Sequence, residues 1–242
     1  MTILTIDNND FYYEVHGTGE PIIFAHGLGG NHASWYKQVT VLSKAYQVIT
    51  FDHRGFGNST DKEGLGRSGF VSDLLALLDH LNINKAALVG QSMGGGTMLT
   101  FANQYPERVA GLVIADSLHG LVESDDVATL MNTARKTTTN LTQLQRVLGK
   151  SYYDENPEAA LLYQQLNSFN NTDRSNLVGQ YANEKVSPEQ LAAIDVPIMF
   201  LAGQDDIIFP IEAIRLVQEK IEGSFIVEFD NCGHSAFFEK PI

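Results

Sequence analysis

LVGQSMGGG, residues 88–96, is an apolar run that breaks into a serine flanked by glycines and then continues as a helical pattern. It contains the Gly-x-Ser-x-Gly spacing, with Ser92 between Gly90 and Gly94, at a strand-to-helix junction. At such a turn the serine backbone is strained, and a side chain at either glycine position would collide with the neighbouring strand or helix. A structural serine that caps a helix in a small-residue turn would also suit this spacing, so the rest of the chain must decide between the two readings.

The composition is that of a globular protein with a strong negative charge. The 242 residues are 43% hydrophobic, which suffices for a sizeable core in one large domain, with or without an insertion. The formal net charge of −13 argues against nucleic acid and acidic membrane surfaces as partners, because their phosphates would be repelled. No apolar run is long enough to span a bilayer, and Asp7 and Asp10 stand where a signal peptide needs a cationic start. The single cysteine, Cys232, excludes an intrachain disulfide, so we expect a cytoplasmic protein.

Short apolar runs alternate with helical patterns along most of the chain, and this predicts a parallel sheet covered by helices on both faces. The helix after Ser92 is expected to be amphipathic, because apolar residues recur at helical spacing from Met98 to Tyr105. Another helix is expected to begin at a cap on Ser34. The expected strands are 2–6, 11–15, 21–25, 47–51, 86–89, 112–115, 198–201 and 225–229.

The alternation is interrupted after Ser117. From residue 118 to residue 193 the sequence has helical patterns and polar linkers but no convincing strand. The sequence therefore predicts two parts: an α/β core of residues 1–117 and 194–242, and an all-helical insertion of residues 118–193.

Polar residues follow several of the expected strands. In an open α/β sheet ligands bind outside the carboxyl ends of the strands, so these residues are expected to meet at one edge. They are the loop His26–Gly30 (HGLGG), Ser92, Asp116, the pair 205–206 and His234. A nucleophile, an acid and a base thus occur in the order Ser, Asp, His, which is one of the three unrelated orders of serine hydrolase triads.

With these residues in place, the chain resembles the α/β-hydrolases of the capped esterase, lactonase and carbon–carbon hydrolase type. The resemblance covers nearly the whole chain and implies a mostly parallel, doubly wound sheet with a helical cap inserted after the strand that follows the nucleophile helix. Five stretches carry it: HGLGG at 26–30, DHRGFGNS at 52–59, GQSMGG at 90–95, GQDDIIFP at 203–210 and CGHSAFFEKP at 232–241.

The resemblance implies a Ser-His-Asp triad. A serine hydroxyl is barely ionised and needs a base, and the base needs an orienting carboxylate. Ser92 is the expected nucleophile and His234 the expected base. The family spacing places the acid on Asp206, four residues before Pro210, while Asp116 is an alternative acid because some related hydrolases take theirs from the strand before the cap.

Backbone donors and a substrate surface are expected beside this triad. The Met93 N–H, at the helix N-terminus, is one expected oxyanion donor. The resemblance implies the Leu28 N–H, chosen over that of Gly29, as the second. Gly27 and Gly29 are expected to border the substrate, and Phe237 to contact it near the base.

Three nearby residues are expected to be structural. By resemblance, His26 braces the HGLGG loop and Arg54 anchors neighbouring loops. Cys232 is expected to be a small buried thiol. The scattered histidines have no ligand-like pairing, so neither a metal nor a cofactor is expected.

The sequence thus predicts a serine hydrolase that cleaves carboxylic esters through an acyl-enzyme. Apolar residues of the insertion suggest a small or medium apolar acyl group, and the absence of a basic cluster there favours simple esters over acidic lactones or ring-cleavage products. These apolar residues are Leu130, Met131, Leu162, Leu166 and Phe169.

Several alternatives remain open. The same triad would serve a lactonase, a carbon–carbon bond hydrolase or a perhydrolase, and a slow-turnover ligand receptor is the alternative from another class. We expect a small ester-like substrate and water as partners, no nucleic acid or membrane, and a monomer or homodimer. Because related proteins continue into a final amphipathic helix where this chain stops, at Ile242, we also expect a longer natural chain.

Overall fold

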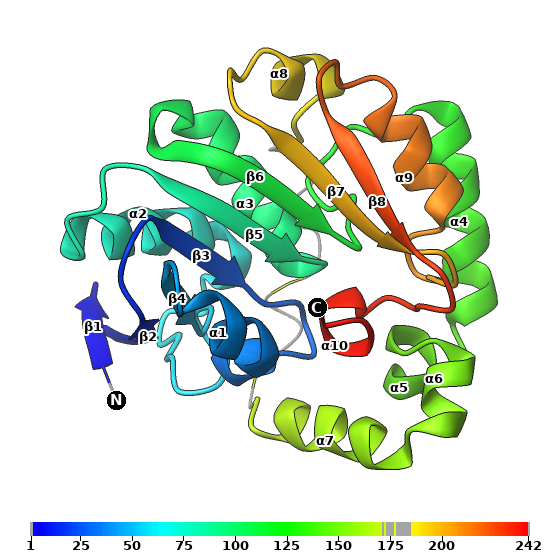
Figure 1. The fold of residues 1–242 in the computed structure, drawn as a ribbon, viewed down its shortest axis with the longest axis horizontal. Coiled ribbons are helices and arrows are strands. Elements are labelled where there is room, and N and C mark those ends of the chain that lie inside the picture. The colour runs from blue at the N-terminus through cyan, green and yellow to red at the C-terminus, as the bar shows by residue number, and fades with distance from the viewer. Residues whose placement is uncertain (1, 171, 173–176, 178–184, 242) are drawn as a thin grey trace.

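The computed structural model describes residues 2–170, 172, 177 and 185–241. Its strands are β1 (Thr2–Ile6), β2 (Asn9–His16), β3 (Pro21–Ala25), β4 (Gln47–Phe51), β5 (Ala86–Gln91), β6 (Val109–Ala115), β7 (Ile198–Gly203) and β8 (Phe225–Phe229). In the described residues they form one eight-stranded sheet in the order β1-β2-β4-β3-β5-β6-β7-β8 (Figure 1). The pairs β1–β2 and β2–β4 are antiparallel, and all pairs from β4 to β8 are parallel. The predicted α/β fold with a mostly parallel sheet is confirmed.

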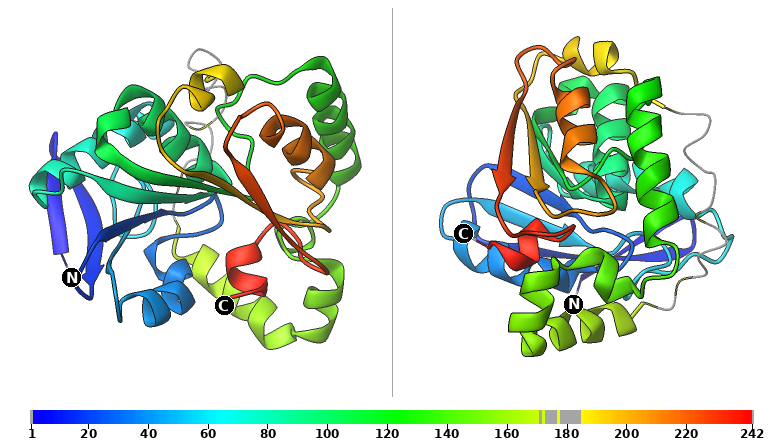
Figure 2. Two further views of the ribbon diagram at one scale, coloured as in Figure 1. Left: turned by 45° about the horizontal axis from the view of Figure 1, so that its top comes forward. Right: turned by 90° about the vertical axis from the view of Figure 1, so that its right-hand side faces the viewer.

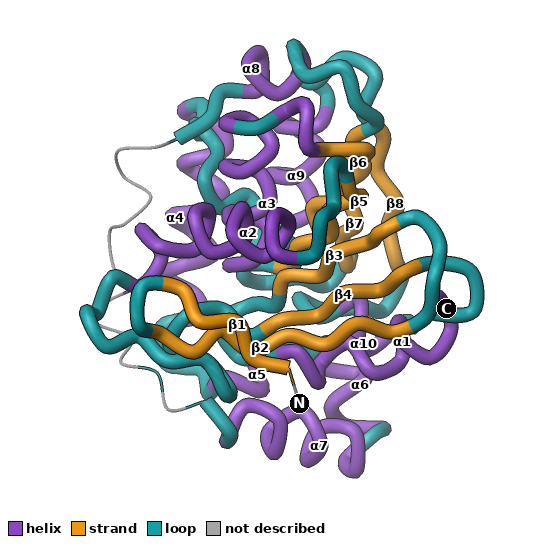
Figure 3. The backbone as a smooth tube through the Cα atoms, turned by 90° about the vertical axis from the view of Figure 1, so that its left-hand side faces the viewer, coloured by secondary structure: helices purple, strands orange, loops and turns teal. Residues whose placement is uncertain are grey.

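Helices cover both faces of this sheet. Helix α1 (Tyr36–Leu42) lies on one face, and α2 (Phe70–His80), α3 (Met93–Gln104) and α9 (Ile211–Gln218) lie on the other (Figure 2). The main core is formed by the strands and the inward sides of these helices. The antiparallel strands β1 and β2 form one edge of the sheet, as Figure 3 shows, so the parallel centre is left to β3, β5 and β6.

Helix α3 differs from its prediction as an amphipathic helix, because every residue from Met93 to Ala102 is buried. The helix packs against β5 and β6 on one side and against α2 on another. The glycines of its first turn permit this close approach, because a Cβ on Gly95 would lie 2.8 Å from the Ser117 Cβ. The helix therefore has no solvent face along most of its length, and apolar spacing alone could not show that.

The predicted helix cap on Ser34 is also wrong. A 3₁₀ turn, His32–Trp35, precedes α1, and the Asn31 side chain caps it by accepting the Ala33 N–H at 3.0 Å. The Ser34 hydroxyl instead accepts the Asn31 N–H at 3.1 Å. Both polar residues satisfy backbone donors, but the helix begins at the earlier one because the chain already turns there after β3.

Between β6 and β7 the described residues form helices α4 (Asp125–Thr138), α5 (Gln143–Val147), α6 (Lys150–Glu155), α7 (Pro157–Ser168) and α8 (Pro188–Ala192), which we call the helical insertion. Helix α4 packs against α9, and its Val127 and Met131 belong to the main core. Helices α5 to α7 pack around a second cluster that includes Tyr163 and Phe238. The division at residues 118 and 193 stays a prediction.

The outer strand β8 carries exposed apolar side chains. Phe225 and Val227 are 50% and 37% exposed, and they pair in register with the half-buried Met199 and Leu201 of β7.

Within the described ranges no helix has the length and apolar character that crossing a bilayer requires.

Candidate active site

Ser92 stands in a sharp turn between β5 and α3, with φ 49° and ψ −114°. A Cβ on Gly90 would overlap the Gly94 carbonyl, and a Cβ on Gly94 would overlap the Ala25 carbonyl of β3. These are the helix and strand collisions that the sequence predicted for the two glycines. The Ser92 N–H donates to the Ala115 carbonyl of β6 at 3.0 Å, which fixes the serine at the carboxyl edge of the sheet.

The His234 imidazole is paired with Asp206. Its Nδ1 lies 2.9 Å from the Asp206 Oδ2. The other oxygen, Oδ1, accepts the backbone N–H groups of Ile208 at 2.7 Å and Phe209 at 3.0 Å. Both side chains are buried, so the carboxylate is held in place and directs Nδ1–H toward itself. The Nε2 atom is then the nitrogen that can accept a proton.

Two contacts place His234 beside the serine turn. Gln91, which precedes Ser92, donates its Nε2–H to the His234 carbonyl at 2.8 Å. The Phe209 ring stacks on the imidazole, with centroids 5.7 Å apart. The loops after β5, β7 and β8 therefore meet at one edge of the sheet, as the strand-end argument predicts.

Asp116, the alternative acid, contacts backbone groups. It has φ 47°, its Oδ1 accepts the Gly203 N–H, and its Oδ2 accepts the Ala236 N–H, both at 3.0 Å. Burial and the neighbouring Asp206 carboxylate raise the pKa of Asp116 well above its ordinary value. Because both Asp116 oxygens are engaged, the geometry favours Asp206 as the carboxylate that orients His234.

Burial and charge act in opposite directions on the pKa of His234. Burial alone lowers this pKa, because it disfavours the imidazolium. The charge and hydrogen bond of the Asp206 carboxylate, with smaller contributions from Asp116 and Glu239, together more than offset burial. The net pKa of His234 is raised above the ordinary histidine value of 6.5.

The HGLGG loop after β3 is held by its own histidine. The His26 Nδ1 lies 2.8 Å from the Gly27 carbonyl, and its Nε2 accepts the His53 N–H at 3.0 Å. Burial lowers the pKa of His26 to about 4, which keeps Nε2 free to accept. The Gly27 carbonyl also accepts the Gly30 N–H. In a trans peptide the N–H that follows a carbonyl points the opposite way, so these bonds turn the Leu28 N–H away from His26.

The two residues predicted as oxyanion donors belong to one apolar cluster. The Leu28 and Met93 side chains pack in one apolar cluster with Phe56 and Phe70. Met93 is the first residue of α3, where backbone N–H groups and the helix dipole favour negative charge. The donor roles themselves stay predictions.

The helical insertion reaches this site over Gly29. A Cβ on Gly29 would overlap the Gln143 amide of α5 and lie 3.2 Å from the Tyr163 hydroxyl of α7. A Cβ on Gly27 would overlap the Gln91 amide and lie 3.1 Å from the Ser92 Cβ. Both glycines thus border the site closely. Tyr163 was missed because, within an apolar helical pattern, its hydroxyl gives no signal of its position.

Several apolar residues predicted to contact the substrate pack elsewhere or are exposed. The Phe237 ring packs on Trp35, with centroids 4.7 Å apart, on the side of the sheet under α1. Met131 packs in the main core, whereas Phe169 and Leu162 are 68% and 40% exposed. Roles for these residues in binding a substrate stay predictions.

The expected structural residues have the contacts that such roles need. The buried Arg54 pairs with Asp73 through its Nε at 2.9 Å and its Nη2 at 2.6 Å. Cys232 is buried, and burial raises the pKa of its thiol, which disfavours a reactive thiolate. Asp205 is exposed and its N–H donates to the Cys232 carbonyl. Over the described part of the chain, no three His, Cys, Asp or Glu side chains form a group suited to a metal ion.

Known proteins similar to this chain include hydrolases and a putative non-heme chloroperoxidase. A putative carbamate hydrolase, RutD, of Azorhizobium caulinodans is 27% identical over 250 residues, covering 93% of this chain and 88% of that protein. A putative non-heme chloroperoxidase of Synechocystis sp. is 44% identical over 108 residues, but the match covers only 43% of this chain and 39% of that protein. A thermophilic esterase structure from Thermogutta terrifontis superposes with a TM-score of 0.82 at 25% identity, covering 99% of this chain and 93% of that one.

The family assignment follows from a match that spans most of the chain. The family model for the alpha/beta hydrolase fold matches residues 20–241, and these residues contain β3 to β8, the serine turn and the Asp206–His234 pair. The chain therefore belongs to the alpha/beta hydrolase fold family.

Proposed function

We propose that this protein hydrolyses carboxylic esters through a covalent acyl-enzyme on Ser92. The observation that carries the proposal is the buried Asp206–His234 pair at 2.9 Å, which Gln91 links to the serine turn. A neutral imidazole oriented by a carboxylate is the base that a weakly acidic hydroxyl needs.

In the proposed reaction, the Ser92 hydroxyl attacks the ester carbonyl while the His234 Nε2 takes its proton. The Leu28 and Met93 N–H groups bind the oxyanion that forms. Each such donor typically lowers the free energy of the transition state by roughly 3 kcal/mol. His234 then gives the proton to the leaving alcohol, and the acyl group stays on Ser92. A water molecule, deprotonated by the same histidine, releases the acid and restores the serine.

We propose a small or medium, largely apolar acyl group as the substrate's reacting part. Gln143 and Tyr163 approach Gly29 from the helical insertion, which supports a cap that confines the acyl side of the substrate. Lactone opening, carbon–carbon cleavage, perhydrolysis and carbamate hydrolysis use the same attack on a carbonyl. A receptor with very slow turnover is the alternative without productive chemistry.

A panel of p-nitrophenyl esters with acyl chains from acetate upward tests the proposal. We expect ordinary enzyme turnover that is greatest for short or medium chains. A phosphonate ester that traps serine nucleophiles should stop the reaction and add its mass to the peptide that contains Ser92. Tight ligand binding with negligible turnover would support the receptor instead. Turnover of lactones but of no ester would show that the protein is a lactonase.

We expect kcat/KM for these esters to fall with decreasing pH through a midpoint above pH 6.5. His234 must be neutral to act as a base, and its pKa is raised, because the neighbouring carboxylates, chiefly Asp206, together more than offset burial. Activity is therefore present above this raised pKa and is lost below it. A pH–rate profile, with circular dichroism at each pH as control, measures the midpoint. A midpoint well below 6.5 in a folded protein would contradict this assignment of the base.

A further inference from the structure

One buried carboxylate bridges the helical insertion and the loop that carries His234. Glu239, in α10 (Ala236–Glu239), is 6% exposed. Its Oε1 accepts the Gly149 N–H at 3.1 Å, and its Oε2 accepts the Gly233 N–H at 3.0 Å. Gly149 immediately precedes α6 of the insertion, and Gly233 immediately precedes His234. We call this arrangement the Glu239 bridge.

Backbone lies directly against backbone at this bridge. A Cβ on Gly233 would overlap the Gly149 backbone, and a Cβ on Gly203, at the end of β7, would overlap the Gly233 carbonyl. Gly233 is therefore enclosed between the insertion and the sheet, with no side chain as a spacer. A contact of this kind transmits displacement, because closely packed atoms cannot absorb it by changing rotamer.

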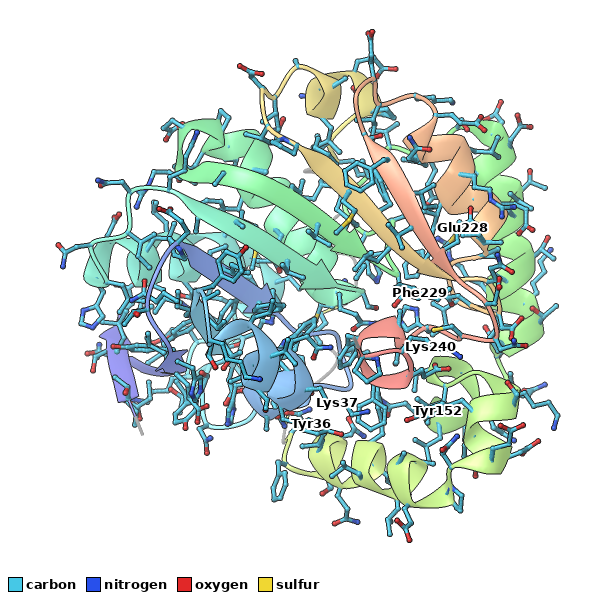
Figure 4. All side chains as sticks on the ribbon, viewed as in Figure 1. Tyr36, Lys37, Tyr152, Glu228, Phe229 and Lys240 are labelled. Atoms are coloured by element: carbon cyan, nitrogen blue, oxygen red, sulfur yellow. The ribbon has the colours of Figure 1, made fainter. Side chains whose placement is uncertain are left out.

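The other side of α10 is fixed to the region of α1. The Lys37 ammonium donates to the Phe238 carbonyl at 3.0 Å, and the Gln38 amide donates to the Phe237 carbonyl at 2.8 Å. Figure 4 shows Lys37 on one side of α10 and Tyr152 of α6 on the other. With α10 anchored in this way, the Glu239 carboxylate has a defined position from which it holds both glycine N–H groups.

We propose that Glu239 is a positioning residue, which fastens the helical insertion to the histidine loop and thereby sets the place of the His234 ring. This inference rests on the proposed hydrolase function, because it assigns Glu239 a role through His234 and not in contact with substrate. Both oxygens act as acceptors, so a carboxylate is required. A glutamine has one acceptor oxygen, and its NH₂ group would face a backbone N–H that then lacks a partner.

The negative charge of Glu239 provides a second way to test this role, through the pKa of His234. The charged and titratable groups that act on His234 are Asp206, Asp116, Glu239 and His119. The Glu239 carboxylate contributes to the raised pKa of His234, so its removal lowers that pKa, whereas a change on the insertion side of the bridge keeps this charge. The two effects can therefore be separated by variants on either side of the bridge.

The test uses the full chain and p-nitrophenyl acetate. Glu239→Gln is expected to lower kcat by about tenfold to a hundredfold, the range for a catalytic group displaced by about 1 Å, with KM nearly unchanged and the acid midpoint of the pH profile shifted downward. Gly149→Ala places a Cβ 2.9 Å from the Glu239 Oε2 and 3.0 Å from the Gly233 nitrogen, and should lower kcat with a smaller shift of the midpoint than Glu239→Gln, because the carboxylate charge is retained. Glu158→Gln, an exposed change of the same chemistry in α7, is the matched control and should behave as wild type.

The outcomes distinguish this inference from the proposed function. If wild type hydrolyses the ester and both bridge variants keep its kcat and pH midpoint, the positioning role is overturned while the hydrolase stands. If wild type hydrolyses no ester, the proposed function fails, and the inference fails with it. Should Glu239→Gln not fold, as thermal unfolding will show, Gly149→Ala decides: a kcat equal to that of wild type overturns the role.

Discussion

Ser92→Ala is expected to lower kcat/KM for p-nitrophenyl esters by about 10⁵-fold to 10⁶-fold, the range seen when a hydrolase loses its nucleophile. No covalent intermediate can form without the hydroxyl, and only binding and the oxyanion donors then assist the attack of water. The Ser92 side chain makes no capping hydrogen bond, so the variant should fold as wild type does. Initial-rate kinetics and thermal unfolding of both proteins check this result.

The control is Ser168→Ala, which removes an exposed hydroxyl at the end of α7 and should leave the rate unchanged. Loss of less than about a hundredfold in Ser92→Ala would mean that water attacks the ester directly, or that another group is the nucleophile. Substrate binding should persist in the inactive variant, since Ser92 supplies chemistry and not contact area.

Asp206→Asn is expected to lower kcat by about 10³-fold to 10⁴-fold, because the imidazole would be held in the wrong tautomer. The Ile208 and Phe209 N–H groups require an acceptor, so the asparagine oxygen would remain on them. The NH₂ group would then face the His234 Nδ1 and donate to it. The proton would move to Nε2, which could no longer act as a base.

The matched comparison is Asp116→Asn. This is the same chemical change, but the Asp116 oxygens accept two backbone N–H groups at 3.0 Å and are not paired with the His234 imidazole. It should cost about 1–3 kcal/mol of stability through one unsatisfied donor, with kcat within about tenfold of wild type. Steady-state kinetics and urea unfolding separate the two effects. Activity that survives Asp206→Asn and collapses in Asp116→Asn would assign the acid to Asp116.

Much of the fold can be predicted from the sequence because buried parallel strands are short, continuous apolar runs. Each expected strand is present, several of them extended at an end. Periodicity is less informative about what a helix contacts. Periodicity predicts a helix after Ser92, but it does not show that α2 covers the outer side of that helix. It also predicts α4 without showing that α4 packs on α9.

The candidate site is predictable where chemistry follows a strand, and unpredictable where partners are distant in sequence. His234 and Asp206 follow neighbouring strands, which brings them to one edge of the sheet. Glu239 lies in a recognisable motif, yet its contact with Gly149 joins residues 90 positions apart and involves a backbone N–H that every residue except proline has. Phe237 and Phe238 are adjacent on a short helix, so their rings point to different neighbours, and the spacing does not indicate which one lies near the substrate.

The φ of 49° at Ser92 has a consequence for how the proposed active site responds to heat. A non-glycine residue in that region costs on the order of 1–3 kcal/mol, and the packing of the surrounding glycines, β3 and α3, with the hydrogen bond to β6, maintains it. A whole domain is stable by only about 5–15 kcal/mol, so this local cost is a substantial fraction of the margin. We expect warming to let the serine relax to an ordinary backbone conformation while the sheet stays intact. We therefore expect heating to inactivate the proposed hydrolase before the sheet unfolds, because the turn at Ser92 is the part of the site that stores backbone strain.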